Sequence, residues 1–338
     1  MRGGNPQHCA SEYVMSAKPI FKRLKYKNIL IILAVVVVVI IFVVSAKNAG
    51  DNDNSSSLSE SSSQGDNSSK TPDSSSDGDS NINTEPEKLP KNSFTYIKAT
   101  DSVLASTGTL VIIDGTSQYK GEAPTDLLSS YDYMFNQERE KLFKIKDANV
   151  KAKLITLEAV NKMMSGFSKE YGTASMVMMN GYESSDLNSE LSTGYSVNFL
   201  LQNSDSSYSD FNAVGSYEWI AKNCYTYGLI QRYPEVKSAI TGVTKETGVF
   251  RYVGLPHAQI MTKNNLVLEE YIELIKKYSY SDALCYTTDD KTDYAIYYVA
   301  AQGETTNIQI PTNSDGSKYP YEISGDNKGG YIVTVKLP

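Results

Sequence analysis

An uncharged apolar run followed by a long polar tract confines any large folded domain to residues 93–338 of this 338-residue chain. Residues 29–46 carry no charge and include five consecutive valines, from Val35 to Val39. A helix rises 1.5 Å per residue, so a helix over this run is about as long as the hydrocarbon core of a bilayer is thick. We therefore predict one transmembrane helix over residues 29–46.

The charges on either side of this run predict its orientation. Four basic residues lie within residues 22–27, before the run, whereas Asp51 and Asp53 follow it. Basic flanks stay in the cytoplasm, which predicts a cytoplasmic tail over residues 1–28 and an extracellular C-terminal part in a single-pass cell-membrane protein. A cleaved signal peptide is the alternative, because Val44-Ser45-Ala46 resembles a cleavage site. The long basic region and the length of the run favour the anchor.

Residues 47–92 consist largely of Ser, Asp, Asn, Gly and Pro. Such a segment buries too little apolar surface to offset the entropy lost on ordering, so we predict a disordered linker between membrane and folded part. The formal net charge of −7 provides no basic face, which argues against nucleic acid as a partner. Cys224 and Cys285 either pair in an oxidising space or remain buried thiols, a choice that spacing does not decide.

Hydrophobic periodicity predicts an α+β domain over residues 93–338. Apolar residues recur at helical spacing in residues 152–171, including Leu154, Leu157, Val160, Met164 and Phe167. Further helices are predicted over residues 217–227, which end before Gly228, and over residues 266–278. Strands are predicted over residues 109–113, 175–179, 195–201, 294–299, 307–310 and 330–336, the last three in a β-rich meander.

Two segments of this domain resemble the motifs of one peptidase family. Residues 189–198 read SELSTGYSVN, and residues 246–254 read ETGVFRYVG. They resemble the SxHxxGxAxD and EPWHFRYVG motifs of the VanY-type D-alanyl-D-alanine carboxypeptidases. Residues 218–223 and 227–234 resemble the helix-to-strand unit of that family, and ITG at residues 240–242 also matches. The resemblance covers nearly all of residues 93–338.

The resemblance implies a fold and a division of the chain. It implies a D-Ala-D-Ala carboxypeptidase-like domain, an antiparallel sheet flanked by helices, over residues 93–280. A β-rich C-terminal extension, similar to that of clostridial members, follows over residues 281–338. The transmembrane helix and the disordered linker precede both.

The family holds a catalytic zinc ion with the His and Asp of the first motif and the His of the second. The matching positions in this chain are Leu191, Asn198 and Val249. Leucine and valine have no lone pair, and an amide oxygen is a poor zinc ligand. The resemblance therefore implies a peptidase fold that has lost its zinc ligands, so we expect no cofactor.

Other positions of the matched motifs form the expected cleft. Glu246 stands where the family has its general base, and we expect burial to raise its pKa. Glu183, in GYES at residues 181–184, replaces the Arg that clamps the substrate carboxylate, which reverses the charge there. Ser189 and Arg251 belong to the retained frame.

The remaining chemistry-bearing residues give no second catalytic set. His8 and His257 are the only histidines, and His8 precedes the predicted transmembrane helix. We expect His257, after a Gly-Leu-Pro turn, to pack or cap; a makeshift metal site with Glu246, Glu190 and Asp186 has no supporting spacing. Ser117 and Lys120 form an SxxK that follows a predicted strand, and no KTG accompanies it.

Two hypotheses follow from the sequence. The first is a membrane-anchored, extracellular pseudo-carboxypeptidase of the bacterial cell envelope, which binds peptidoglycan stem peptides or an envelope protein without zinc catalysis. The second is an active zinc D-alanyl-D-alanine carboxypeptidase that trims peptidoglycan peptides and whose ligands lie elsewhere. Metal dependence distinguishes the two hypotheses.

Overall fold

The structure is a computed structural model that describes residues 88–338, apart from 115 and 136–140. The predicted cytoplasmic tail, the predicted transmembrane helix and the linker up to residue 87 lie outside these residues. Within the described part, no helix combines the length and the apolar character needed to cross a membrane.

The first large sheet has the strand order β3-β5-β6-β9-β8, and β7 pairs with the outer part of β6. All of its pairs are antiparallel except β3 with β5. Its strands are β3 (Lys144–Ile145), β5 (Met176–Asn180), β6 (Ser196–Gln202), β7 (Tyr208–Asp210), β8 (Leu229–Gln231) and β9 (Val249–Tyr252). The long helix α4 (Leu154–Tyr171) packs on one face, where Val160, Met163 and Met164 are fully buried with Phe250.

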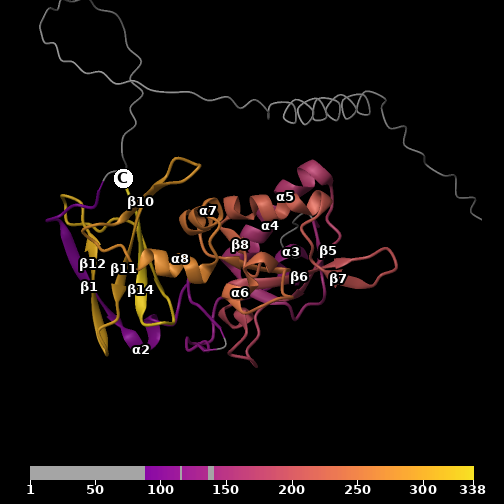
Figure 1. The fold of residues 1–338 in the computed structure, drawn as a ribbon, viewed down its shortest axis with the longest axis horizontal. Coiled ribbons are helices and arrows are strands. Elements are labelled where there is room, and N and C mark those ends of the chain that lie inside the picture. Colours follow the sequence, from indigo (N-terminus) through magenta and orange to yellow (C-terminus); the bar gives the residue numbers. More distant parts are fainter. Residues whose placement is uncertain (1–87, 115, 136–140) are drawn as a thin grey trace, which may run out of the picture. The chain divides into compact units, whose positions relative to one another are not determined.

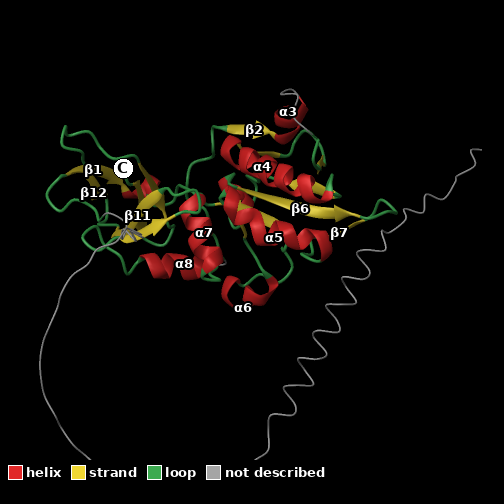
Figure 2. Ribbon diagram, turned by 90° about the horizontal axis from the view of Figure 1, so that it is seen from above, coloured by secondary structure: helices red, strands yellow, loops and turns green. Residues whose placement is uncertain are grey.

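A second sheet, of order β10-β11-β14-β13, is formed by the C-terminal strands. These are β10 (Leu284–Thr287), β11 (Asp293–Ala300), β13 (Tyr321–Gly325) and β14 (Gly330–Lys336), all antiparallel. The helices α7 (Leu255–Lys263) and α8 (Leu268–Ile275) lie between the two sheets (Figures 1 and 2). One hydrophobic cluster joins Ile230 and Val253 of the first sheet region, Ile272 of α8, and Ile296 and Ile332 of the second sheet.

Smaller elements complete the domain. Two short ladders pair β1 (Phe94–Thr100) with β12 (Thr305–Pro311) and β2 (Leu127–Ser129) with β4 (Lys151–Lys153). The short helices are α2 (Asp101–Leu104), α3 (Ser130–Phe135), α5 (Glu218–Asn223) and α6 (Ser238–Thr241), with 3-10 turns η1 (Glu190–Thr193), η2 (Gly215–Tyr217), η3 (Cys224–Tyr227) and η4 (Glu235–Lys237). The predicted domain boundary at residue 280 stays a prediction, although β1 shows that the first described strand pairs with the C-terminal segment.

Most predicted elements are confirmed. The strands predicted within residues 175–201 are β5 and β6, and those predicted after residue 290 are β11, β12 and β14, the last with the predicted bounds. The helices predicted over residues 152–171 and 266–278 are α4 and α8. In α8 the whole predicted apolar face is buried, because Leu268, Tyr271, Ile272 and Ile275 have no exposed area. In α4, Leu154 is the exception: it begins the helix and is 44% exposed.

The strand predicted over residues 109–113 is wrong. Residues 110–113 are buried, as their apolar sequence indicates, but they run as turn and coil. The Leu110 amide donates to the Ser324 Oγ at 2.9 Å, and the Ile112 amide donates to the Asp326 carbonyl oxygen at 3.1 Å. These two partners satisfy buried backbone groups without a neighbouring strand, so an apolar run is not paired into a sheet here.

The helix predicted over residues 217–227 is only partly confirmed. It divides into α5 and the tighter 3-10 turn η3, and the segment ends at Gly228, whose φ of +75° is left-handed. The Asn223 side chain donates to the Trp219 carbonyl oxygen at 2.7 Å, and the Thr226 hydroxyl donates to the Asn223 carbonyl oxygen at 2.8 Å. Such side-chain bonds compete with regular helical bonds and shorten the α-helical part.

Truncating the buried face of α8 tests the role of this helix as the link between the sheets. We expect Ile272→Ala to lower the free energy of unfolding by about 2–5 kcal/mol, because the removed methylenes leave a cavity in a fully buried cluster. The same change at Ile240, which is 46% exposed, should cost no more than about 0.5 kcal/mol. Denaturant unfolding of the purified protein measures both values; equal losses would show that α8 does not carry the core.

Candidate functional site

The matched motif positions meet on one face of the pair formed by β6 and β9. Asn198 of β6 lies directly opposite Val249 of β9, and Ser196 lies opposite Arg251. Side chains alternate along a strand, so these four residues share a face, while Phe250 and Tyr252 point to the other face. Val249 is 2% exposed, whereas Asn198 is half-buried.

The first motif reaches the same face through the 3-10 turn η1. The Ser189 Oγ accepts a hydrogen bond from the Leu191 amide at 3.2 Å and so caps the start of the turn. Gly194, with a φ of +72°, ends it and lets the chain enter β6. Leu191 is half-buried, and the carboxylate of the preceding Glu190 accepts from the Ser196 hydroxyl at 2.9 Å. That bond holds η1 against β6.

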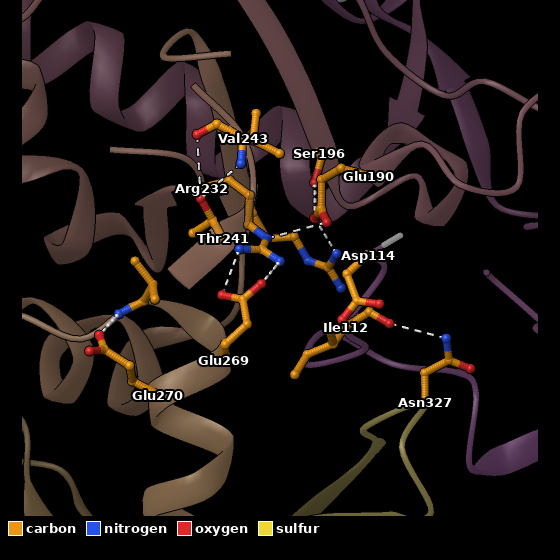
Figure 3. A network of polar contacts seen from close by, with 12 residues as sticks. Ile112, Asp114, Glu190, Ser196, Arg232, Thr241, Val243, Glu269, Glu270 and Asn327 are labelled. Carbon is orange, nitrogen blue, oxygen red and sulfur yellow. Dashed lines mark hydrogen bonds and ion pairs between the residues drawn. The ribbon is translucent and has the colours of Figure 1, made fainter. Parts of the chain in front are cut away.

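A buried cluster of charges lies beneath this face (Figure 3). The Glu190 carboxylate is ion-paired with Arg251 and, at 3.3 Å, with the Nε of Arg232. Arg232 also forms a two-pronged ion pair with Glu269 of α8, at 3.0 and 2.6 Å. Both arginines are fully buried, and Glu190 is 3% exposed. Burial alone would raise the pKa of Glu190, but Arg251 and Arg232 outweigh it and leave the pKa lowered.

Glu246 lies in the turn that leads into β9, where its carbonyl oxygen accepts from the Val249 amide at 3.1 Å. The residue is solvent-exposed, and no described residue donates a hydrogen bond to its carboxylate. Partial burial of the carboxyl group, and then the negative charge of Glu190, raise its pKa, as the sequence predicted. Glu246 is therefore the one free carboxylate beside the Asn198 and Val249 pair within the described residues.

Comparisons with known proteins agree with this frame. The family model of D-alanyl-D-alanine carboxypeptidase (VanY) matches residues 127–255, which contain β2 to β9. A D-alanyl-D-alanine carboxypeptidase of Enterococcus faecium is 29% identical over 277 residues, which cover 75% of this chain and 85% of that protein. The crystal structure of the vancomycin resistance D,D-dipeptidase VanXYg, in complex with a D-Ala-D-Ala phosphinate analogue, superposes with a TM-score of 0.61 at 25% identity; the match covers 72% of this chain and 99% of that one. By family model, curated relative and solved structure, the chain resembles the VanY D-Ala-D-Ala carboxypeptidases.

A shorter match concerns the bifunctional D-Ala-D-Ala dipeptidase and D-Ala-D-Ala carboxypeptidase VanXYC of Enterococcus gallinarum. It is 58% identical over 45 residues, which are 13% of this chain and 24% of that protein. The resemblance to the VanY family supports a function related to that of peptidases acting on peptidoglycan peptides.

The residues at the VanY motif positions do not fit a zinc ion. A catalytic zinc site uses three protein ligands with nitrogen, oxygen or sulfur donors. Leu191 and Val249 offer only carbon, and the Asn198 amide is uncharged. Nowhere in the described residues do three or more His, Cys, Asp or Glu side chains converge as a possible metal site.

Glu183, which the motif resemblance aligns with the clamping Arg, is exposed near η1. Its amide donates to the Leu191 carbonyl oxygen at 3.4 Å, which keeps it near the first motif. Its carboxylate accepts from the Ser185 hydroxyl at 2.7 Å and the Ser185 amide at 3.0 Å, and these bonds lower its pKa. A carboxylate thus faces solvent where the family pattern has a cation.

His257 is part of the core and lies in a helix rather than after a turn. The Gly-Leu-Pro sequence starts helix α7 at Leu255, so His257 is a helical residue, and it is 3% exposed. Its Nδ1 lies 2.6 Å from the Tyr271 hydroxyl, and its Nε2 lies 3.0 Å from the Thr334 Oγ1. Burial lowers its pKa to about 3. The expectation that His257 packs is confirmed.

Neither Cys224 nor Ser117 lies in an arrangement that would make it a catalytic nucleophile. Cys224 is a buried free thiol whose Sγ lies 3.7 Å from the Ala221 carbonyl oxygen, so it is not joined to Cys285. Burial raises the pKa of its thiol to about 12, which suppresses the thiolate. Ser117 exchanges two backbone hydrogen bonds with Asp114 in a tight turn, so the SxxK does not open a helix.

Sequence reasoning missed Arg232 as a partner of Glu190, and Glu269 as the second partner of Arg232. Arg232 stands in the matched RYP of the helix-to-strand unit, and Glu269 stands in the first turn of α8. The available signal was a basic residue inside an otherwise apolar strand, as in VFRY of β9, because such a residue needs a buried counter-charge. The spacing along the chain does not identify that partner.

Neutralising Glu190 tests the buried cluster. We expect Glu190→Gln to lower the free energy of unfolding by about 3–5 kcal/mol at pH 7, because the buried Arg251 then loses the carboxylate with which it is ion-paired, while Arg232 keeps Glu269 alone. Glu218→Gln, which removes an exposed ion pair with Lys222, should change it by no more than about 1 kcal/mol. Urea titrations of both variants provide the comparison; a small loss in the first would show that the cluster is not a stabilising unit.

His257 makes the stability depend on pH in the mildly acidic range. Its pKa is about 3 when folded and near 6.5 when unfolded, so the unfolded chain binds the proton first and stability falls as pH drops below 6.5. We expect His257→Gln to flatten the loss of unfolding free energy between pH 6.5 and pH 5. Glu183→Gln should leave that interval unchanged, because the Glu183 carboxyl has a lowered pKa and titrates below it. An unaltered slope in His257→Gln would contradict the assignment.

Proposed function

We propose that this protein is a membrane-anchored, extracellular VanY-like pseudo-carboxypeptidase, which binds peptidoglycan stem peptides or an envelope partner without zinc catalysis. The anchor in this proposal is the apolar run at residues 29–46, and the tether is the polar tract that follows it. The observation that carries the proposal is the buried Val249 opposite Asn198 on a VanY frame, since a carbon side chain there cannot bind a metal.

The retained frame supports binding rather than loss of the cleft. The cap of η1, the β6–β9 ladder and the buried cluster do not involve any of the three predicted ligand positions through their side chains. The frame therefore does not require a metal to form. VanXYg was solved with a D-Ala-D-Ala phosphinate analogue, so a frame of this kind accommodates a peptide terminus in that relative.

The charges beside the frame indicate which part of a peptide this chain would contact. Glu183 and Glu246 are both exposed carboxylates, and neither has an ion pair within the described residues. They repel a terminal carboxylate and attract an ammonium group. A stem peptide contains both kinds of group, so we infer contact through an amino group rather than capture of the terminal D-alanine.

Zinc stoichiometry separates this proposal from an active enzyme. We expect the purified full-length protein, dialysed against zinc and then against zinc-free buffer, to retain close to no zinc by elemental analysis and to release no D-alanine from a pentapeptide. One tightly held zinc ion per chain, with D-alanine release, would overturn the proposal and establish the active D-alanyl-D-alanine carboxypeptidase instead.

Restoring the ligands tests whether the cleft is preserved. We expect the triple variant Leu191→His, Asn198→Asp, Val249→His to bind about one zinc ion per chain, because three donors would again converge on an open site. A control with Leu191→Gln and Val249→Gln introduces polar groups of similar size that do not bind zinc. A folded triple variant that holds no more zinc than this control would show that the VanY cleft has not survived.

A further inference from the structure

Two adjoining cavities lie where the start of α7 meets the C-terminal sheet. Their volumes are about 250 and 410 Å³, and both are lined by Tyr252, His257, Glu322 and Thr334. Together they fall within the range of roughly 300–1,000 Å³ that is typical of small-molecule sites. The bond between the His257 Nε2 and the Thr334 Oγ1 joins α7 to β14 in this region. We call the combined cavity the α7–β13 groove.

This groove adjoins the candidate cleft at Thr109, which lines it and accepts from Arg251, but its tyrosine wall lies on the other side of β9. Tyr252 lines the groove, whereas Val249 and Arg251 belong to the cleft face, and alternation along β9 directs Tyr252 to the opposite side of the sheet. The groove also includes residues of β13 and β14 in the C-terminal segment, which the matched family region at residues 127–255 does not contain. The cleft and the groove can therefore bind different parts of one large ligand.

Four tyrosines provide the apolar surface of the groove. Tyr195, Tyr252, Tyr294 and Tyr321 line it and are half-buried. Within the described residues, none of their hydroxyls has a hydrogen-bond partner. Ile155, which is 42% exposed, adds an aliphatic side chain. A tyrosine that is packed on one side and open on the other offers a flat ring face together with a polar hydroxyl.

The polar groups of the groove balance in charge. Glu322 carries a carboxylate and Lys336 an ammonium group, and neither is ion-paired within the described residues. Asp126, at the rim, is already paired with Lys153 at 2.5 Å. Burial first, and then the charge of Glu322, raise the pKa of Tyr252 to about 12, so its hydroxyl remains a donor beside that carboxylate. His257 is uncharged at neutral pH.

Such a groove suits a ligand that is neutral, ring-shaped and rich in hydroxyl and amide groups. The C–H faces of a pyranose ring pack on tyrosine faces, while its hydroxyls donate to a carboxylate and accept from an ammonium or phenol group. An acetamido group adds an amide for hydrogen bonding and a methyl group for Ile155. We propose that the α7–β13 groove binds N-acetylated sugar rings of a glycan strand. This proposal rests on the proposed function only because that function places the protein at the cell wall.

Binding to wall fractions tests this proposal with the full-length protein. The probes are intact peptidoglycan sacculi, glycan strands from which an amidase has removed all peptides, and a tetramer of N-acetylglucosamine. We expect the protein to co-sediment with intact sacculi and to bind the peptide-free strands and the tetramer in calorimetric titrations. Tyr294→Ala and Glu322→Gln should each weaken binding to the tetramer about tenfold, through loss of a ring face or of a charged acceptor.

Matched controls are Tyr208→Ala, on the exposed strand β7, and Glu304→Gln, outside the groove, which should leave the affinity unchanged. If peptide-free glycan is not bound, or if the groove variants bind it as the wild type does, the groove proposal is wrong even when intact sacculi are retained. Loss of binding to sacculi as well would contradict the proposed function. Weakened binding of stem peptides alone in the groove variants would assign the groove to peptide and overturn the glycan assignment.

Discussion

The buried pairing of Glu190 with Arg251 and Arg232 holds together the parts of the molecule on which the candidate site depends. Arg251 lies in β9, Arg232 directly follows β8, Glu190 begins η1, and Glu269 lies in α8. Two fully desolvated guanidinium groups would be costly alone, but here each has a carboxylate within ion-pair distance. Arg251 also donates to the Thr109 carbonyl oxygen at 3.1 and 2.9 Å, which fixes the buried segment of residues 109–113 without a strand partner. One charge cluster thus joins four elements and a loop.

This arrangement holds the three motif positions in place through contacts made by other residues of the chain. In a structural zinc site the free energy of metal binding is itself folding free energy, so removing ligands unfolds the domain. Here the elements that carry Leu191, Asn198 and Val249 are fixed by Glu190, by the Ser189 cap and by the β6–β9 ladder. Val249 adds a fully packed apolar side chain where a histidine would be solvated or coordinated. The stability of the frame therefore rests on contacts other than those of these three side chains.

The sequence predicts the local elements of this fold better than the contacts between them. Helix α8 and strand β14 carry unbroken periodic patterns, and both form where those patterns place them. The run at residues 109–113 has the same apolar character, but its amides bond to Ser324 and Asp326, more than two hundred residues away, so no local signal identifies its state. The motif resemblance predicts that Asn198 and Val249 lie at one site. The pairing of β6 with β9 places these two residues directly opposite each other. The ion-pair partners of Glu190 could not be predicted from the sequence, because tertiary packing determines which charged residues meet.

The side chains on the two faces of β9 differ in how they are packed and bonded. On the cleft face, Arg251 is ion-paired with a buried carboxylate and Val249 is packed, so both side chains are buried. On the other face, Tyr252 leaves its hydroxyl open toward a groove whose far wall belongs to β13 and β14. The far wall lies outside the matched family region, but Ile332 packs it against the first sheet and Thr334 bonds it to α7. Tyr252 and residues of β13 and β14 therefore line a surface on the side of β9 opposite Val249.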